Sequence, residues 1–162
     1  MRLLAIDPGT RESAWVVWDG RQILAHGKQI NEHVLAMIHV ECTAKFDSCC
    51  IEMVASFGMP VGAEVFETVY WIGRFCEAVI AKQKDAYRVT RNEIKNHLCH
   101  TSKAKDANIR QAIIDRLGPV GTKKNPGACY GISGDVWSAL AVALTWGDKI
   151  GISSGLQRRG DL

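Results

Sequence analysis

Three acidic residues stand out because each is the only charged side chain in an apolar segment. Asp7 ends an apolar run just before a Pro-Gly pair, Glu52 lies within the run 48–54, and Asp135 opens the apolar stretch 133–144. A charge inside an apolar layer is costly unless it is paired or bound to a metal. Three such acids suggest one shared site, and the partner that would tolerate them together is a hard divalent cation.

Each acid also has a simpler interpretation when it is taken alone. Asp7 before Pro8 and Gly9 is typical of a turn after a strand, in which the Asp side chain accepts backbone hydrogen bonds. A single Glu in a strand often lies on an edge or on a solvated face. Asp135 could be a helix N-terminal acid that complements the helix dipole. The occurrence of all three acids in one chain favours the metal site.

Length and composition restrict the class of protein. A chain of 162 residues is long enough to fold as one domain with its own core. No apolar run reaches the length of a membrane span, and the N-terminal run is too short for a signal peptide. We therefore expect a cytoplasmic protein that does not bind membranes, whose six cysteines are reduced thiols. The net charge of +3 does not by itself establish a nucleic-acid partner.

The elements that must position the acids follow an α/β pattern. Strands are predicted at residues 2–8, 12–18 and 21–28, and the last two are joined by a hairpin turn at Asp19-Gly20. Periodicity then predicts helices over 31–45, 63–82, 91–98, 104–117 and 134–150, with strands at 48–54 and 87–90. Residues 119–132 are rich in Gly and Pro and are predicted to form a loop. We expect one domain over residues 1–150 and a flexible tail over 151–162.

The order of these elements and acids resembles a known family. Asp7-Pro-Gly-Thr, the strand-borne Glu52 and the segment Gly134-Asp-Val-Trp-Ser-Ala-Leu-Ala are similar to the RuvC-like branch of the RNase H superfamily. The sequence looks most like the Holliday junction resolvases of bacteriophages and prophages, and segment 57–75 also resembles the phage versions. The resemblance covers roughly residues 1–150. It implies an RNase H-like α/β fold, in which helices flank a five-stranded mixed sheet with three antiparallel leading strands.

The resemblance also implies an activity. It indicates a Mg²⁺-dependent endodeoxyribonuclease that cleaves Holliday junctions and other branched DNA in recombination, repair or phage DNA processing, in a bacterial or phage-infected cytoplasm. Two Mg²⁺ ions, or Mn²⁺ as a substitute, would be held by Asp7, Glu52 and Asp135, with Asp7 bridging both. The family usually has a second acid three residues further along the last helix. Here Ser138 occupies that position, on the same helix face as Asp135, and is a candidate catalytic residue with weaker ligand chemistry.

Basic residues supply candidate DNA contacts, because Lys and Arg side chains bind the phosphate backbone. They gather between residues 88 and 110 and in the loop before the last helix. The candidates are Arg91, Lys95, Lys103, Lys105, Lys123 and Lys124, and a solvated helix face is the alternative for each. The resemblance places Lys95 nearest the scissile phosphate, as a candidate catalytic residue. Phe57 is a candidate apolar wedge at the junction centre, although it could simply begin the next helix.

The helix predicted over 63–82 carries apolar residues on more than one face. They include Val65, Phe66, Val69, Tyr70, Trp71, Ile72 and Phe75. A helix of this kind must bury two faces, and cleavage of a two-fold symmetric junction needs two active sites. With the resemblance, this predicts a homodimer. Burial within a single core is the alternative.

Other functions share parts of this pattern. An RNase H-type nuclease that cuts RNA:DNA hybrids would carry the same acids and differ in its binding surface. A non-catalytic DNA-junction-binding module is suggested by Ser138. An actin-like or sugar-kinase ATPase also begins with a strand, an acid and a Gly-Thr turn, but it needs two such domains. A zinc site at His97, Cys99 and His100 does not have a standard spacing.

Overall fold

The computed structural model describes residues 1–40, 45–56, 58 and 60–152, so Phe57 and residues 153–162 of the predicted tail lie outside the described residues. The described strands form one sheet in the order β3-β2-β1-β4-β5. Their bounds are β1 Leu3–Asp7, β2 Glu12–Trp18, β3 Ile23–Ile30, β4 Ser48–Met53 and β5 Asp85–Thr90. β1, β2 and β3 are antiparallel, whereas β4 joins β1, and β5 joins β4, in parallel. The predicted five-stranded mixed sheet with three antiparallel leading strands is confirmed.

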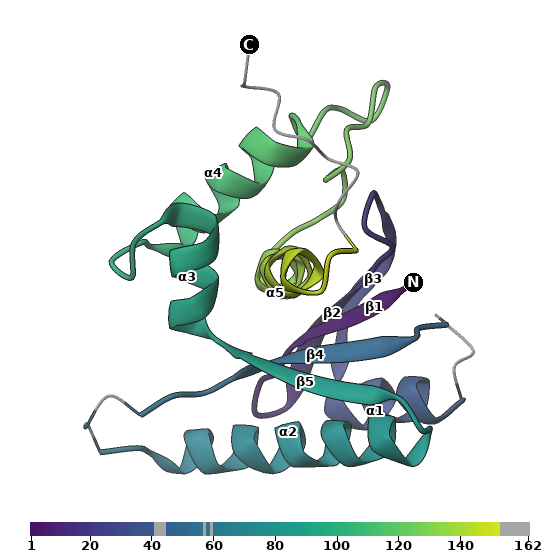
Figure 1. Cartoon of the computed structure of the whole chain (residues 1–162), viewed down its shortest axis with the longest axis vertical. Coiled ribbons are helices and arrows are strands. Elements are labelled where there is room, and N and C mark those ends of the chain that lie inside the picture. Colours follow the sequence, from purple (N-terminus) through teal and green to yellow (C-terminus); the bar gives the residue numbers. More distant parts are fainter. Residues whose placement is uncertain (41–44, 57, 59, 153–162) are drawn as a thin grey trace.

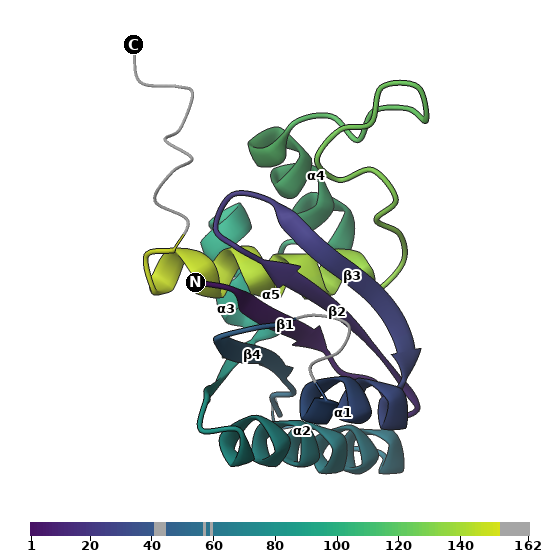
Figure 2. The ribbon, with the colours of Figure 1, turned by 90° about the vertical axis from the view of Figure 1, so that its right-hand side faces the viewer.

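Helices cover both faces of this sheet (Figure 1). α1 (Asn31–Val40) and α2 (Ala63–Ala81) lie side by side on one face, and α5 (Val136–Lys149) crosses the other. α3 (Arg91–Cys99) and α4 (Asp106–Leu117) pack beyond α5, as Figure 2 shows from a second direction. None of the described helices is both long and apolar enough to cross a membrane.

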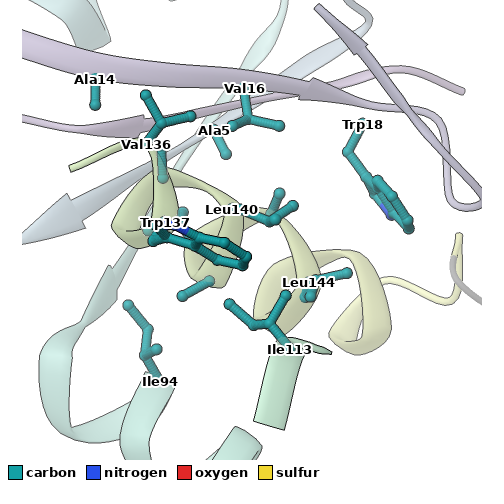
Figure 3. Packing of buried hydrophobic residues seen from close by; sticks show 14 of the residues in the cluster. Ala5, Ala14, Val16, Trp18, Ile94, Ile113, Val136, Trp137, Leu140 and Leu144 are labelled. Carbon is teal, nitrogen blue, oxygen red and sulfur yellow. The ribbon is translucent and has the colours of Figure 1, made fainter. Parts of the chain in front are cut away.

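The core on the α5 face explains the uninterrupted apolar sequence of that helix. Val136, Leu140 and Leu144 pack towards small and branched side chains of β1 and β2, including Ala5 and Val16 (Figure 3). α3 and α4 cover the opposite side of α5, for example through Ile94 and Ile113. A helix that is enclosed on several sides must be apolar over most of its circumference. The position of the α5 N-terminus is thereby fixed over the sheet.

The core on the opposite face is made by the alternate residues of the same strands. Leu4 and Ile6 of β1 point towards α1 and α2, while Leu3 and Ala5 point towards α5. Successive side chains of a strand point to opposite faces. β1 is therefore buried on both sides, and its first four residues, Leu3 to Ile6, are all apolar.

Several element boundaries differ from those predicted. β3 begins at Ile23 instead of residue 21, because the Asp19 carboxylate accepts hydrogen bonds from the backbone N–H groups of Arg21 and Gln22, both at 2.8 Å. β5 begins two residues earlier than predicted, at Asp85, which pairs with β4. The helices predicted over 104–117 and 134–150 are shorter and span 106–117 and 136–149. The helix predicted over 31–45 is described over 31–40, and residues 41–44 lie outside the described residues.

Candidate active site

Asp7 and Glu52 are neighbours at one end of the two central strands. β1 and β4 pair in parallel up to Ile6 opposite Ile51, so Asp7 and Glu52 follow as the next pair in the same row. Alternate residues of both strands pack against α5, which places these two acids on the α5 face. Neighbouring strands lie about 4.8 Å apart. Two carboxylates therefore share the space at the end of the sheet.

The same row continues across the sheet to a basic residue. Asp7 pairs with Ala14 of β2, and Ala14 pairs with Lys28 of the edge strand β3. The Nζ atom of Lys28 lies 2.8 Å from the Oδ2 atom of Asp135, which is brought to this end of the sheet by α5. The sequence analysis did not identify Lys28. Its position depends on the pairing of β2 with β3, which includes an irregularity between Val17 and Trp18.

Asp135 occupies the N-cap position of α5 but does not act as a capping side chain. Its carboxylate makes no side-chain capping hydrogen bond and pairs with Lys28 instead. Ser138, three residues further on, lies close enough to Asp7 that its hydroxyl lowers the pKa of that carboxyl. Asp135 therefore lies at the helix N-terminus, as the simpler interpretation of a dipole-complementing acid requires, and it also faces the other acids of the site. The structure brings Asp7, Glu52, Asp135 and Ser138 together.

A buried polar network holds the turn that follows Asp7. Ser13 Oγ donates to Asn31 Oδ1 at 2.6 Å, and Asn31 Nδ2 donates to the carbonyl oxygen of Gly9 at 3.0 Å. The backbone N–H of Gly9 donates back to Ser13 Oγ at 3.3 Å. A Cβ atom on Gly9 would lie only 2.4 Å from the carbonyl oxygen of Glu12, so the close turn requires glycine. Ser13 and Asn31 were not predicted from the sequence. Each is a polar residue at a position where the strand or helix pattern predicts a buried side chain, and this could have identified them.

The electrostatics of the site centre on Asp7. Burial, together with the charges of Glu52 and Asp135, raises the pKa of Asp7 to about 7, against the opposing effects of Arg91 and the Ser138 hydroxyl. Burial also raises the pKa of Glu52, again against the nearby Arg91. Asp7 is the acid whose negative charge is least compensated by the protein. A cation placed beside Asp7 would lower the free energy of its ionised form.

Arg91 lies among the acids. Its Nη1 atom is 3.3 Å from Oε2 of Glu52, and its Nη2 atom contacts Asp106 at the start of α4. Arg91 follows β5 directly and begins α3, where the Thr90–Glu93 capping box fixes the helix start. The sequence analysis predicted Arg91 as a DNA contact. In the structure its guanidinium contacts two carboxylates, and the DNA contact stays a prediction.

The other predicted DNA contacts lie at different distances from this site. Lys95 is close enough to Glu52 that its positive charge opposes the rise in the pKa of that acid. The remaining four are exposed and lie before α4 or in the loop before α5: Lys103, Lys105, Lys123 and Lys124. Of these candidates, Lys95 is the one whose charge acts on the pKa of an acid of the site. Phe57 lies outside the described residues.

His97, which the sequence placed in the non-standard zinc pattern, belongs with Asp148 to a separate network. Nε2 of His97 lies 2.7 Å from Oδ2 of Asp148, and Arg116 donates to both oxygens of the same carboxylate at 2.6 and 2.7 Å. These contacts tie α3 and α4 to the C-terminal end of α5. The network therefore fixes the position of α3, the helix that carries Arg91 and Lys95.

The donors at the site match a hard divalent cation in their chemistry. The three acids and Ser138 offer carboxylate and hydroxyl oxygens, which Mg²⁺ prefers, and Asp7 carries an uncompensated charge. Among the residues that the structure describes, no three His, Cys, Asp or Glu side chains are already arranged as a metal site. Two of the acids are instead paired with Lys28 and Arg91. These residues could hold a divalent ion once the two ion pairs open.

The fold of the chain is found in two solved structures of RuvC from Thermus thermophilus. The first shows 17% sequence identity and a TM-score of 0.66, covering 94% of this chain and 98% of that chain. The second, RuvC in complex with a Holliday junction substrate, shows 16% identity and a TM-score of 0.66, covering 94% and 97%. No protein-family model and no curated protein sequence matches the chain. The structural matches confirm the predicted RNase H-like fold.

Proposed function

We propose that this protein is a metal-dependent, structure-selective DNA endonuclease that cleaves four-way junctions and other branched DNA. The observation that carries the proposal is the row in which Asp7 and Glu52 stand together beneath Asp135 and Ser138 at the start of α5. The same fold in a RuvC structure that holds a Holliday junction supports a junction substrate. The resemblance of the sequence to phage and prophage enzymes suggests a role in recombination, repair or phage DNA processing in a bacterial cytoplasm.

The residues of the site would divide the work as follows. Asp7, Glu52 and Asp135 would hold two Mg²⁺ or Mn²⁺ ions, which when bound supply the Lewis acidity that phosphodiester hydrolysis requires. Ser138, whose hydroxyl lowers the pKa of Asp7, would help to orient the Asp7 carboxylate. Lys95, which lies near Glu52, would bind the phosphate beside the scissile bond.

Exposed lysines beyond the site would bind the rest of the DNA backbone. Lys103 and Lys105 precede α4, while Lys123 and Lys124 lie in the loop that leads to α5. Both segments adjoin helices that pack around the α5 face. Contacts of this kind give affinity without sequence preference, and they weaken as salt concentration rises.

We also propose that two copies of the chain form a dimer through α2. On the outer surface of α2, Phe66 is 64% exposed and Tyr70 is 57% exposed, next to the exposed Val69. Leu35 and His39 of α1 line a groove with Val69 and Tyr70 of about 620 Å³. A second copy would cover this apolar surface, because a contiguous exposed patch of large apolar side chains is a common mark of an association site.

A non-catalytic junction-binding module is the second candidate function. Two observations favour it: Ser138 stands where a fourth acid would complete the metal site, and Lys28 and Arg91 are paired with two of the three acids. A protein of this kind would bind branched DNA equally well with and without divalent ions. Strictly metal-dependent cleavage would exclude it.

The decisive experiment compares four labelled substrates: a four-way junction, a fork, a linear duplex and an RNA:DNA hybrid. Each is incubated with Mg²⁺, Mn²⁺ or EDTA, using the wild type beside Asp7→Asn. We expect paired symmetric nicks in the junction that are absent in EDTA and reduced by roughly 10³-fold or more in the variant, which should still bind the junction. Cleavage of the hybrid alone would indicate an RNase H-type nuclease. Binding without cleavage under any condition would indicate the binding module.

A further inference from the structure

Lys28 lies on the sheet side of the site, where it forms an ion pair with Asp135. Its Nζ atom lies 2.8 Å from Oδ2 of Asp135 and 3.6 Å from Oε2 of Glu12. It stands in the same row as Asp7, separated from it only by the small side chain of Ala14. The Lys28 side chain is 41% exposed, so it has room to move away from Asp135.

The engagement of Asp135 by Lys28 is not required for the start of α5. The Asp135 carboxylate makes no capping hydrogen bond to the helix backbone. Val136, which follows it, is buried against the sheet and anchors the helix without help from the carboxylate. The ion pair with Lys28 therefore leaves Asp135 free to exchange one cationic partner for another.

We infer that Lys28 is a built-in counter-cation of the carboxylate site, which competes with a divalent metal ion for Asp135. Lys28 is a positioning residue in this role, since it acts through Asp135. In the metal-free protein it holds the Asp135 carboxylate towards β3, and metal loading must displace it. Lys28 thereby lowers the affinity of the site for divalent ions. The inference rests on the proposed function, because it assumes that Asp135 is a metal ligand.

The test measures Mn²⁺ binding to the full chain without DNA, by electron paramagnetic resonance of the free ion, and Mg²⁺ binding by calorimetry. We expect Lys28→Gln to bind Mn²⁺ at least roughly threefold more tightly than the wild type, the scale expected for loss of one partly exposed ion pair. Lys28→Arg, which keeps the charge, should stay near the wild type. Arg21→Gln is the matched control, because it removes one positive charge from the turn at the far end of the same hairpin.

A second pair of variants separates competition at Asp135 from a general change in charge. In an Asp135→Asn background, Lys28→Gln should no longer tighten Mn²⁺ binding. Unchanged or weaker binding by Lys28→Gln would overturn the inference, and so would an equal gain in the Asp135→Asn background. These outcomes leave the proposed function intact as long as the wild type binds Mn²⁺. Failure of both the wild type and Lys28→Gln to bind Mn²⁺ would instead overturn the inference together with the metal site itself.

Discussion

The two faces of the central sheet use the same strands for different purposes. On the α5 face, the apolar core gives way at the end of β1 and β4 to carboxylates, a serine and two basic residues. On the α1–α2 face, the core continues outwards into exposed apolar side chains of α2, such as Phe66 and Tyr70. We propose that the chemistry takes place on the α5 face and that association takes place on the α1–α2 face.

The largest expected effect concerns the stability of the metal-free protein with Asp7→Asn. The pKa of folded Asp7 is about 7, against an ordinary value of 3.8, so the folded state keeps a proton that the unfolded chain loses between these values. The stability that this provides is complete below pH 4 and is lost as pH rises through 7. Asn carries no charge and avoids this loss, so the variant should gain up to about 4 kcal/mol over the wild type above pH 7.

Urea unfolding in EDTA at pH 5 and pH 8 checks this expectation. The difference between variant and wild type should be much smaller at pH 5 than at pH 8. A difference that is the same at both pH values would show that Asp7 is not buried among negative charges. The α5 face would then carry no buried charge that lowers the stability of the protein, and in this respect it would not differ from the α1–α2 face.

The second prediction concerns the face assigned to association. Phe66→Glu combined with Tyr70→Glu places two like charges on the exposed surface of α2, so any dimer that covers it should weaken by roughly 30-fold or more. Sedimentation equilibrium would measure the dissociation constant. Leu24→Glu, on the exposed edge strand β3, is the control and should leave it unchanged. An unaffected dimer would move the association surface elsewhere on the molecule.

The third prediction concerns the buried polar network that links α1 to the turn after Asp7. Asn31→Ala removes the side chain that links Ser13 to the carbonyl oxygen of Gly9, leaving buried polar groups without partners. We expect a loss of about 1–3 kcal/mol in the free energy of unfolding, measured by urea denaturation. Because the Gly9 turn follows Asp7, cleavage by the folded variant should also fall. Unchanged cleavage would mean that the chemical face does not depend on this network.

The smallest expected effect concerns Ser138, which stands at the position of a fourth acid in the site. Ser138→Asp would place a fourth carboxylate beside Asp7 on the α5 face. We expect Mg²⁺ binding to tighten by a few-fold, or the preference between Mg²⁺ and Mn²⁺ to change, because carboxylates bind these ions more strongly than hydroxyls do. Calorimetric titration with each ion would show it. No change in affinity or preference would remove Ser138 from the site.

The sequence was sufficient to predict the strands and the helices, and it singled out three acids that the structure brings near one another. Isolated charges in apolar runs identified Asp7 and Glu52, and the long apolar period of α5 placed Asp135 and Ser138 on one helix face. These signals are local, since each depends on a few neighbouring residues.

The partners of the acids could not be predicted in the same way. Lys28 meets Asp135 only through the register of a hairpin with an irregularity in its pairing, and Arg91 meets Glu52 through the junction between β5 and α3. The buried link between Ser13 and Asn31 joins a strand to a helix that comes later in the chain. Such contacts are set by tertiary packing, which residue spacing does not specify.

The enclosure of α5 has an evolutionary consequence. The acids are carried by the central strands and by the start of a helix packed on several sides, where most substitutions would disturb the core. Lys28 comes from the edge strand β3, at the periphery of the same site, and its side chain is partly exposed. Mutation can therefore exchange this basic residue at little cost to folding. If the proposed site binds divalent ions, a lineage can adjust its affinity for them while the scaffold that holds the acids stays unchanged.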